Sequence, residues 1–225
     1  MRTLSEIRAT GRADLSGRWV EAAMLTFVFY IIVGAFAGVC GWPLNLRAPG
    51  SGSALSLVLL PMGWSYFVIF LSNHRREDND PFAIGHLFDG YRNGQFLRIF
   101  TTTLLVDIYT ILWSLLLIVP GIIKSLSYSM TSFILRDRSD LRDNAAIELS
   151  MDMMKGHKLE LFWLYLSFIG WFILCCFTLG IGFFWLVPYT SASLAAFYED
   201  VKQDYELRYG GAEGDANGTT DNYQK

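Results

Sequence analysis

The chain has 225 residues, of which 52% are hydrophobic and only 17% are charged, and its formal net charge is −3. Soluble globular chains carry about 25% charged residues, so the charges here are too few to cover a water-soluble surface of this size. Seven acidic residues but only three basic ones lie from Glu199 onward. The negative charge therefore belongs to the C-terminal end, and we expect no nucleic-acid partner.

Three long runs contain no Asp, Glu, Lys or Arg: Ala22–Leu46, Ala48–Asn73 and Leu161–Tyr198. A helix needs about 20 apolar residues to cross a bilayer. The third run, drawn as one helix, would be about 57 Å long, which is nearly twice the thickness of the hydrocarbon layer. We therefore expect this run to fold back at Gly180–Gly182.

The same argument divides the run Ile99–Leu135 at Pro120–Gly121. The sequence thus predicts an all-α, polytopic membrane helical bundle with about six transmembrane helices arranged as three hairpins. It forms a single membrane domain, residues 1–200, followed by a disordered cytoplasmic tail, residues 201–225. The expected spans are residues 20–40, 54–72, 99–119, 122–135, 161–179 and 183–198.

The basic residues predict the orientation of these spans. Of the 18 Lys and Arg, all but Arg47 and Lys124 fall before, after or between the hairpins. Such a bias marks the cytoplasmic side, so both termini are expected in the cytoplasm. Lys124 is expected to be interfacial, reaching the outer headgroups from one turn inside an outward-facing hairpin. It lies too far along the hairpin for a direct ion pair with Asp107.

Two of the cytoplasmic connectors have the pattern of amphipathic helices. Asp80–Pro81 has the form of a helix start. The apolar positions that follow in the two connectors are Ile84, Leu87, Phe88 and Tyr91, and then Ile147, Met151 and Met154. These helices either lie on the inner membrane surface or pack under the bundle, and the pattern does not distinguish the two.

Asp107 is the most informative charged residue, because it is expected near the middle of the bilayer. Thr103, Asp107, Thr110 and Ser114 fall at helical spacing on one polar stripe. A carboxyl group at that depth is costly, so it marks either a site for a proton, cation or polar substrate, or a hydrogen-bonded lock between helices.

No enzymatic motif is present, neither a phosphate-binding glycine loop nor the HExxH or GxSxG patterns. The three cysteines show no metal-ligand spacing, and no cofactor is expected. We expect a non-enzymatic membrane module that organises lipid or partner proteins, with a homo-oligomer as one such assembly. The alternative is a small secondary transporter or channel that uses the stripe around Asp107.

The segment from Leu149 onward, with the earlier Pro120–Ile123, resembles a family of uncharacterised bacterial integral membrane proteins, the domain of unknown function 975. The resemblance implies a multi-pass protein of the bacterial cell membrane. It also implies a distant likeness to the membrane domain of some glycerophosphodiester phosphodiesterases, whose catalytic domain has no counterpart here. The matching residues are Ser150, 154–156, Phe162, 166–171, 180–182, Trp185, Pro188, Tyr189, Phe197, Tyr198, Ser127, Tyr128 and Trp19.

Overall fold

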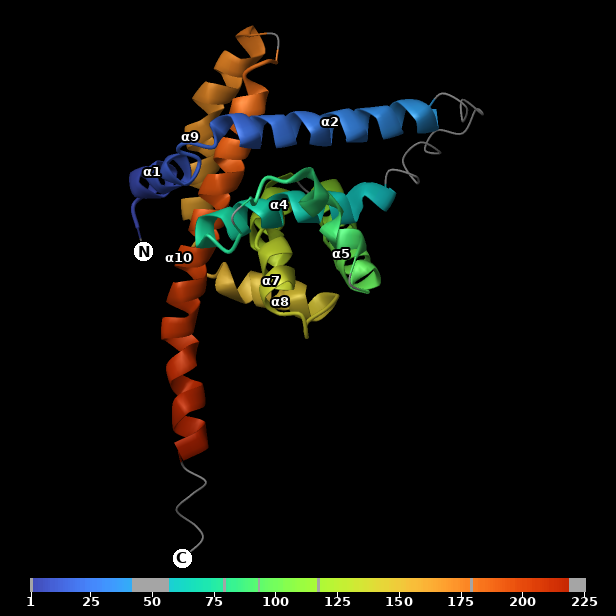
Figure 1. Ribbon diagram of the computed structural model, residues 1–225. Helices are drawn as coiled ribbons and strands as arrows, with labels where there is room; N and C mark the ends of the chain where they lie inside the picture. Colours follow the sequence, from blue (N-terminus) through green and yellow to red (C-terminus); the bar gives the residue numbers. More distant parts are fainter. Residues whose placement is uncertain are drawn as a thin grey trace, which may run out of the picture.

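The computed structural model describes residues 2–41, 57–78, 80–92, 94–116, 118–178 and 180–218. The described part is helical and contains no strand (Figure 1). The elements are α1 (Leu4–Asp14), α2 (Trp19–Gly41), η1 (Leu57–Leu59), α4 (Leu60–Arg75), η2 (Ile84–Tyr91), α5 (Phe96–Leu116), α6 (Ile118–Tyr128), α7 (Thr131–Asp137), α8 (Asn144–Met153), α9 (Lys158–Phe177) and α10 (Phe183–Gly218).

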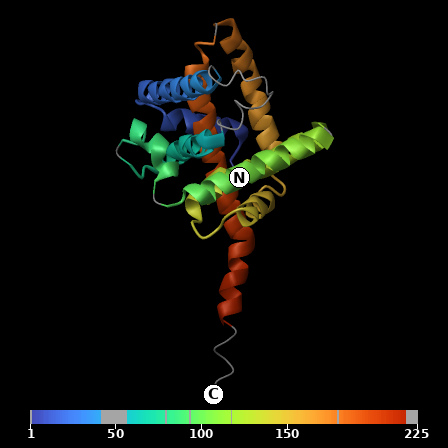
Figure 2. The same cartoon turned by 90° about the vertical axis from the view of Figure 1, so that its right-hand side faces the viewer.

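Helices α9 and α10 form the hairpin that the sequence predicts. The chain turns between Thr178 and Gly182, and Gly180 has a φ angle of +86°, a conformation that costs glycine little. Helix α10 continues well past residue 200, and its last turns extend beyond the other helices (Figure 2). Residues 201–218, which the sequence predicts as part of a disordered tail, lie in α10, and residues 219–225 lie outside the described part. Val201 is fully buried, which explains why the helix does not end there.

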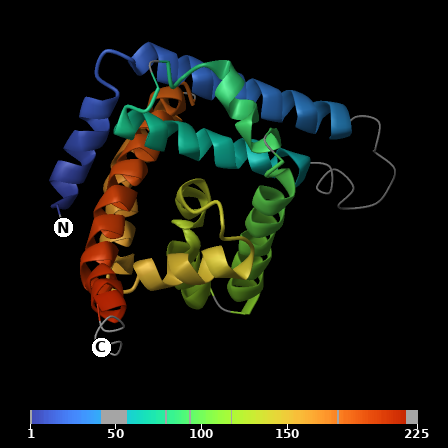
Figure 3. The ribbon, with the colours of Figure 1, turned by 60° about the horizontal axis from the view of Figure 1, so that its bottom comes forward.

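Helices α2 and α4 cross the α9–α10 hairpin rather than running alongside it (Figures 1 and 3). They run in opposite directions, and the hydroxyls of Thr26 and Tyr66 are 2.9 Å apart between them. The first helix, α1, packs against α10. A Cβ atom added at Gly11 would lie 2.5 Å from Ser193 Oγ and 2.8 Å from its backbone nitrogen, so the two helices are in backbone contact there.

The prediction of six spans is not supported. Among the described residues, only Phe96–Leu115 and Lys158–Phe177 are long and apolar enough to cross a membrane, and there is a third span if α1 and α2, which meet at 89°, count as one. Helix α4 has 16 residues, so it is about 24 Å long. Most of its side chains are buried against other helices. Its apolar sequence therefore reflects a place in the protein core.

The predicted third and fourth spans pack together as α5 and α6, but α5 ends at Leu116 and α6 begins at Ile118, so Pro120–Gly121 lies within a helix. Pro120 falls within the first turn of α6, where a missing N–H costs nothing. Gly121 instead allows α6 to approach α5 closely, since a Cβ atom at this position would be 2.7 Å from Ser114 Cα. The fourth span is broken into α6 and α7 at residues 129–130 and is too short to cross a bilayer as one helix.

The two connectors pack against the helices. The first is a 3₁₀ helix that begins after Ala83, not at Asp80, with Leu87 fully buried. The second is α8, with Met154 buried at its end and Gly156 at a φ of +91°. Its start is tied to α5 by the Thr101 hydroxyl, which donates to an Asp143 carboxylate oxygen at 2.6 Å. Of the two alternatives for α8, packing under the other helices is what the structure shows.

The contact at Gly11 can be tested with a matched pair of glycine variants. We expect Gly11→Ala to lower the free energy of unfolding in mild detergent by about 1–3 kcal/mol, because the new methyl group meets the backbone of Ser193. In Gly63→Ala the added atom has no neighbour within 4 Å, so helix propensity should raise the stability by up to about 1 kcal/mol. Equal effects of the two substitutions would contradict the α1–α10 packing.

Candidate functional site

The polar stripe of α5 lines a cavity of about 530 Å³. Thr103, Asp107 and Thr110 all face it, as their helical spacing predicts. Ser114, the fourth predicted member, does not line it and packs against Gly121 of α6 instead. Three of the four candidate residues are thus brought together at one site.

A second set of hydroxyls faces the stripe from α6, α7 and the break between them. These are Ser125, Ser129 and Ser132. Ser125 donates to the carbonyl of Ile122 at 2.9 Å, and Ser129 donates to the carbonyl of Leu126 at 2.8 Å. Because these donors are used within their own helix, the two hydroxyl oxygens present lone pairs to the cavity.

The remaining walls are aromatic and aliphatic. Trp64 is held in place because its indole N–H donates to the carbonyl of Ser132 at 2.8 Å. Tyr128 covers the wall formed by α6. The other apolar lining residues are Phe29, Val33, Leu59, Leu60, Phe67, Val106, Phe133, Tyr165 and Leu194. The polar groups of the lining therefore come from α5 to α7, whereas the residues from α2, α4, α9 and α10 are apolar.

Among the described residues, Asp107 is the single charged residue in the lining, and its side chain is exposed. Within the described ranges no hydrogen bond or ion pair to its carboxylate is found. The second interpretation of Asp107, a hydrogen bond that locks two helices together, is therefore not formed there. A lone carboxylate among hydroxyl acceptors attracts a ligand with a cationic or hydrogen-bond-donating group. The apolar walls suit a hydrocarbon portion.

Lys124 lies on the other side of α6, half buried. Its ammonium group is 5.1 Å from the centre of the Trp113 ring and 3.8 Å from Met151 Sδ of α8. This places it against α8, which the sequence analysis assigns to the cytoplasmic side. The expected position at the outer headgroups remains a prediction, and the structure shows a cation–π contact instead.

A cluster of ionic contacts fixes three of the helices that surround the cavity. Asp137, at the end of α7, accepts two hydrogen bonds from Arg75 of α4, at 2.6 and 2.7 Å. From α10 it accepts one from Lys202 at 2.7 Å and one from the Tyr198 hydroxyl at 2.9 Å. Arg75 also donates to Glu199 at 2.6 Å. Residues far apart in sequence thus share one buried carboxylate.

The charge state of this cluster is fixed at neutral pH. Burial alone opposes ionisation of Asp137, but the hydrogen bonds from Arg75 and Lys202 outweigh it and lower the pKa to about 2. The bond to Asp137 likewise raises the pKa of Arg75. Since α4, α7 and α10 contribute Trp64, Phe133 and Leu194 to the cavity, the cluster sets the spacing of those walls.

Sequence reasoning did not single out this cluster. One signal was available in the sequence. The second helix of each predicted hairpin is followed, on the side where the basic residues gather, by a charged residue of the cluster: Arg75, Asp137 or Lys202. Helices that end on the same side bring their terminal charges together. Which of these charges pair is decided by tertiary packing, which the sequence pattern does not contain.

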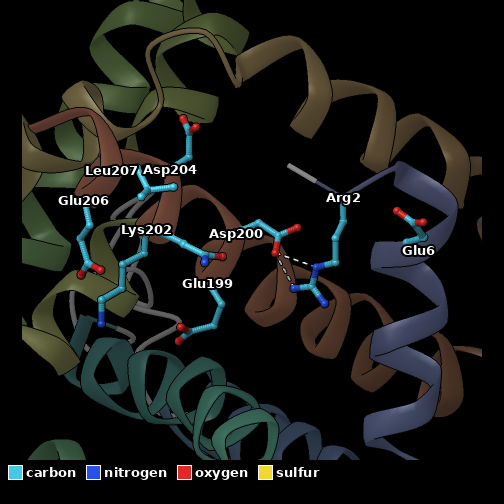
Figure 4. Close-up of a pocket in the computed structure, with 9 residues that line it drawn as sticks. Arg2, Glu6, Glu199, Asp200, Lys202, Asp204, Glu206 and Leu207 are labelled. Atoms are coloured by element: carbon cyan, nitrogen blue, oxygen red, sulfur yellow. Dashed lines mark hydrogen bonds and ion pairs between the residues drawn. The ribbon is translucent and has the colours of Figure 1, made fainter.

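A separate charged pocket of about 910 Å³ lies between α1 and the middle of α10 (Figure 4). Arg2 donates to Asp200 there at 2.7 Å, and Glu6, Glu199, Asp204 and Glu206 also line it. Despite these carboxylates, the described residues include no group of three or more His, Cys, Asp or Glu side chains placed to hold a metal ion. The pocket marks a surface that water solvates, and it is distinct from the cavity at Asp107.

Comparison with known proteins assigns part of this architecture to a family. Residues 115–205 match the family model described as protein of unknown function DUF975. This segment is similar to the DUF975 family. It contains α6 to α9 and most of α10, and therefore Ser125, Asp137 and Lys202, whereas Asp107 and Arg75 precede it. No curated protein and no solved structure gives a match to the chain.

The DUF975 match confirms the family resemblance that the sequence analysis stated. The distant likeness to the glycerophosphodiester phosphodiesterase membrane domain stays a prediction. Because the cavity joins the DUF975 segment to the preceding α4 and α5, any function of this site requires both parts of the chain.

The ionic cluster gives a testable pH dependence. Because the pKa of Asp137 is depressed to about 2, its contribution is present above about pH 4 and is lost as the pH falls toward 2. That contribution corresponds to about 2 kcal/mol. Asp137→Asn should remove this acid-dependent loss and, at neutral pH, lower the free energy of unfolding by about 3 kcal/mol, because Arg75 and Lys202 lose their partner.

The measurement is unfolding in mild detergent as a function of pH. Asp140→Asn is the matched control, because Asp140 is exposed and pairs only with the exposed Arg138, so it should behave like the parent. If the free energy of unfolding of Asp137→Asn still falls at low pH as it does in the parent, another group is responsible for that loss.

Proposed function

We propose that this protein is a non-enzymatic membrane module that binds an amphiphilic, lipid-like molecule in the cavity at Asp107. The observation that supports this function is the mixed lining: a carboxylate and hydroxyls from α5 to α7, and aromatic and aliphatic walls from α2, α4, α9 and α10. An amphiphile with an ammonium or hydroxyl headgroup matches both parts of the lining. No hydroxyl paired with a base, no paired acids and no metal-ligand group is found there among the described residues, so we propose binding rather than chemistry.

The proposed setting is the bacterial cell membrane, with both termini in the cytoplasm. Helices α5 and α9 enter the bilayer from the cytoplasmic side, and α6 and α10 return toward that side. Two features support it: α5 and α9 have the length and composition of spans, and the basic residues fall almost entirely on one side. The charged ends carrying Arg75, Asp137 and Lys202 would then form the cytoplasmic face. The exposed apolar surface of these helices also offers a place for a membrane-protein partner or a second copy of the chain.

Photo-crosslinking tests the cavity. The protein is placed in phosphatidylcholine nanodiscs that contain a minor fraction of phosphatidylethanolamine with a diazirine on its acyl chain. After irradiation, adducts mapped by mass spectrometry are expected on lining residues such as Phe67 and Tyr165. Thr110→Trp fills the cavity and should reduce these adducts about tenfold, the effect of losing about two buried methylene contacts.

Ile111→Trp is the matched control, because the neighbouring Ile111 is 67% exposed and lies outside the lining. It should leave the cavity adducts unchanged. Adducts confined to exposed faces of α5 and α9, with no effect of Thr110→Trp, would contradict the proposal.

A second candidate function is a small secondary carrier or channel, and the observation that favours it is the unpaired carboxylate of Asp107 facing the cavity. In proteoliposomes under a proton gradient, a carrier of this kind should transport protons or cations, and Asp107→Asn should abolish the flux. Asp140→Asn, outside the cavity, should transport like the parent. A parent protein without flux, or a variant that matches it, would remove this candidate and leave the lipid-binding module intact.

A further inference from the structure

An apolar groove of about 620 Å³ lies between α1, the start of α2 and the α9–α10 hairpin. Its walls carry three tryptophans and a tyrosine: Trp19, Trp171, Trp185 and Tyr189. It shares no lining residue with the cavity at Asp107. The groove is therefore a second, independent place for a ligand.

One charged residue, Arg12, lines this groove. Its side chain is exposed, and its guanidinium carbon lies 5.8 Å from the centre of the Tyr189 ring. Within the part of the chain that the structure describes, no carboxylate pairs with Arg12, although Arg2 and Arg75 each have an acidic partner. The groove thus contains a positive charge without a counter-ion.

A second arginine of α1, Arg8, is near this charge in sequence but is not part of the groove lining. It lies one helical turn before Arg12, so both side chains leave α1 on the same face. The Nε atom of Arg8 is buried and has no hydrogen-bond partner among the described residues. A hydrogen-bond acceptor that reached this face of α1 would satisfy it.

The aromatic walls are open rather than sealed by protein. Trp171 is 50% exposed and Trp185 is 49% exposed, and the turn beside them exposes Phe177 and Ile181. Gly182 and Tyr189 are seven positions apart in sequence, so the groove extends about 10 Å along the start of α10 from the end near Arg12. A hydrocarbon chain fits a surface of this shape and composition.

We propose that this groove binds an anionic phospholipid, with the phosphate on Arg12 and an acyl chain along Trp171 and Trp185. A guanidinium group binds phosphate through paired hydrogen bonds, and tryptophan favours the boundary between headgroups and hydrocarbon. Basic pockets between membrane helices select anionic headgroups in the same way. The cavity at Asp107 has the opposite charge, so the two sites select different headgroups.

Native mass spectrometry of the full chain tests the headgroup preference. The purified protein is mixed in detergent with equal amounts of phosphatidylglycerol and phosphatidylcholine. The parent should retain phosphatidylglycerol preferentially, and Arg12→Gln should lose about fivefold of that preference. Arg12→Lys, which keeps the charge, should retain most of it. Arg138→Gln is the control, because Arg138 is an exposed arginine far from the groove.

Tryptophan quenching tests the chain position. Phosphatidylglycerol with brominated acyl chains should quench the fluorescence of the parent, and Trp185→Phe should remove part of the quenched signal. Equal retention of both lipids by the parent would overturn the proposal and leave the groove to an acidic protein partner. An unchanged preference in Arg12→Gln would overturn it as well. Arg12→Gln should not alter photo-adducts in the Asp107 cavity, so this proposal and the proposed function fail separately.

Discussion

The need to keep a large bare apolar surface away from water constrains this whole structure. Helix α5 exposes Ile111, Leu112 and Leu115, and α9 exposes Trp163, Phe172 and Phe177, each by more than half of its area. Soluble monomers rarely expose contiguous apolar patches of such size. The proposal that lipid covers these faces accounts for them without a protein partner. It also leaves the interior free for other contacts, such as the polar cavity at Asp107.

The charged residues are arranged as the complement of that apolar surface. They gather where α4 and α7 end, where α10 changes from apolar to charged, and along α1, and there they pair with one another. Asp137 is the centre of this arrangement, because one carboxylate receives contacts from α4 and α10 while belonging to α7. A buried ion pair adds little net stability on its own, but it penalises every arrangement in which a partner is missing. It therefore helps to specify how the helices around the cavity are placed.

Several features of the fold and the site were predictable from the sequence, for physical reasons that can be named. The turn at Gly180–Gly182 follows from the length of the run Leu161–Tyr198, which no bilayer accommodates as one helix. The convergence of Thr103, Asp107 and Thr110 follows from helical spacing alone. The family relation followed from residues of the second half, which the DUF975 match confirms.

Other features were not predictable, because they depend on tertiary contacts. Hydropathy does not distinguish a helix solvated by lipid from one buried in protein, so α4 was assigned as a span although its side chains fill the core. Likewise, helical spacing placed Ser114 on the polar stripe, but Ser114 packs against Gly121 of α6 and does not line the cavity. The crossing of α2 and α4 over α10, and the contact of Lys124 with Trp113, arise from packing between distant segments.

The central claim is that the exposed faces of α5 and α9 lie in lipid. Spin labels attached one at a time to cysteines introduced along α5 and α9 test it most directly. Two collision rates of each label are measured: one with oxygen, which concentrates in hydrocarbon, and one with a nickel chelate, which is soluble in water. The account predicts oxygen-dominated collisions at positions 111, 115 and 172, with a periodicity of about 3.6 residues along each helix. Dominant collisions with the nickel chelate at those positions would contradict it.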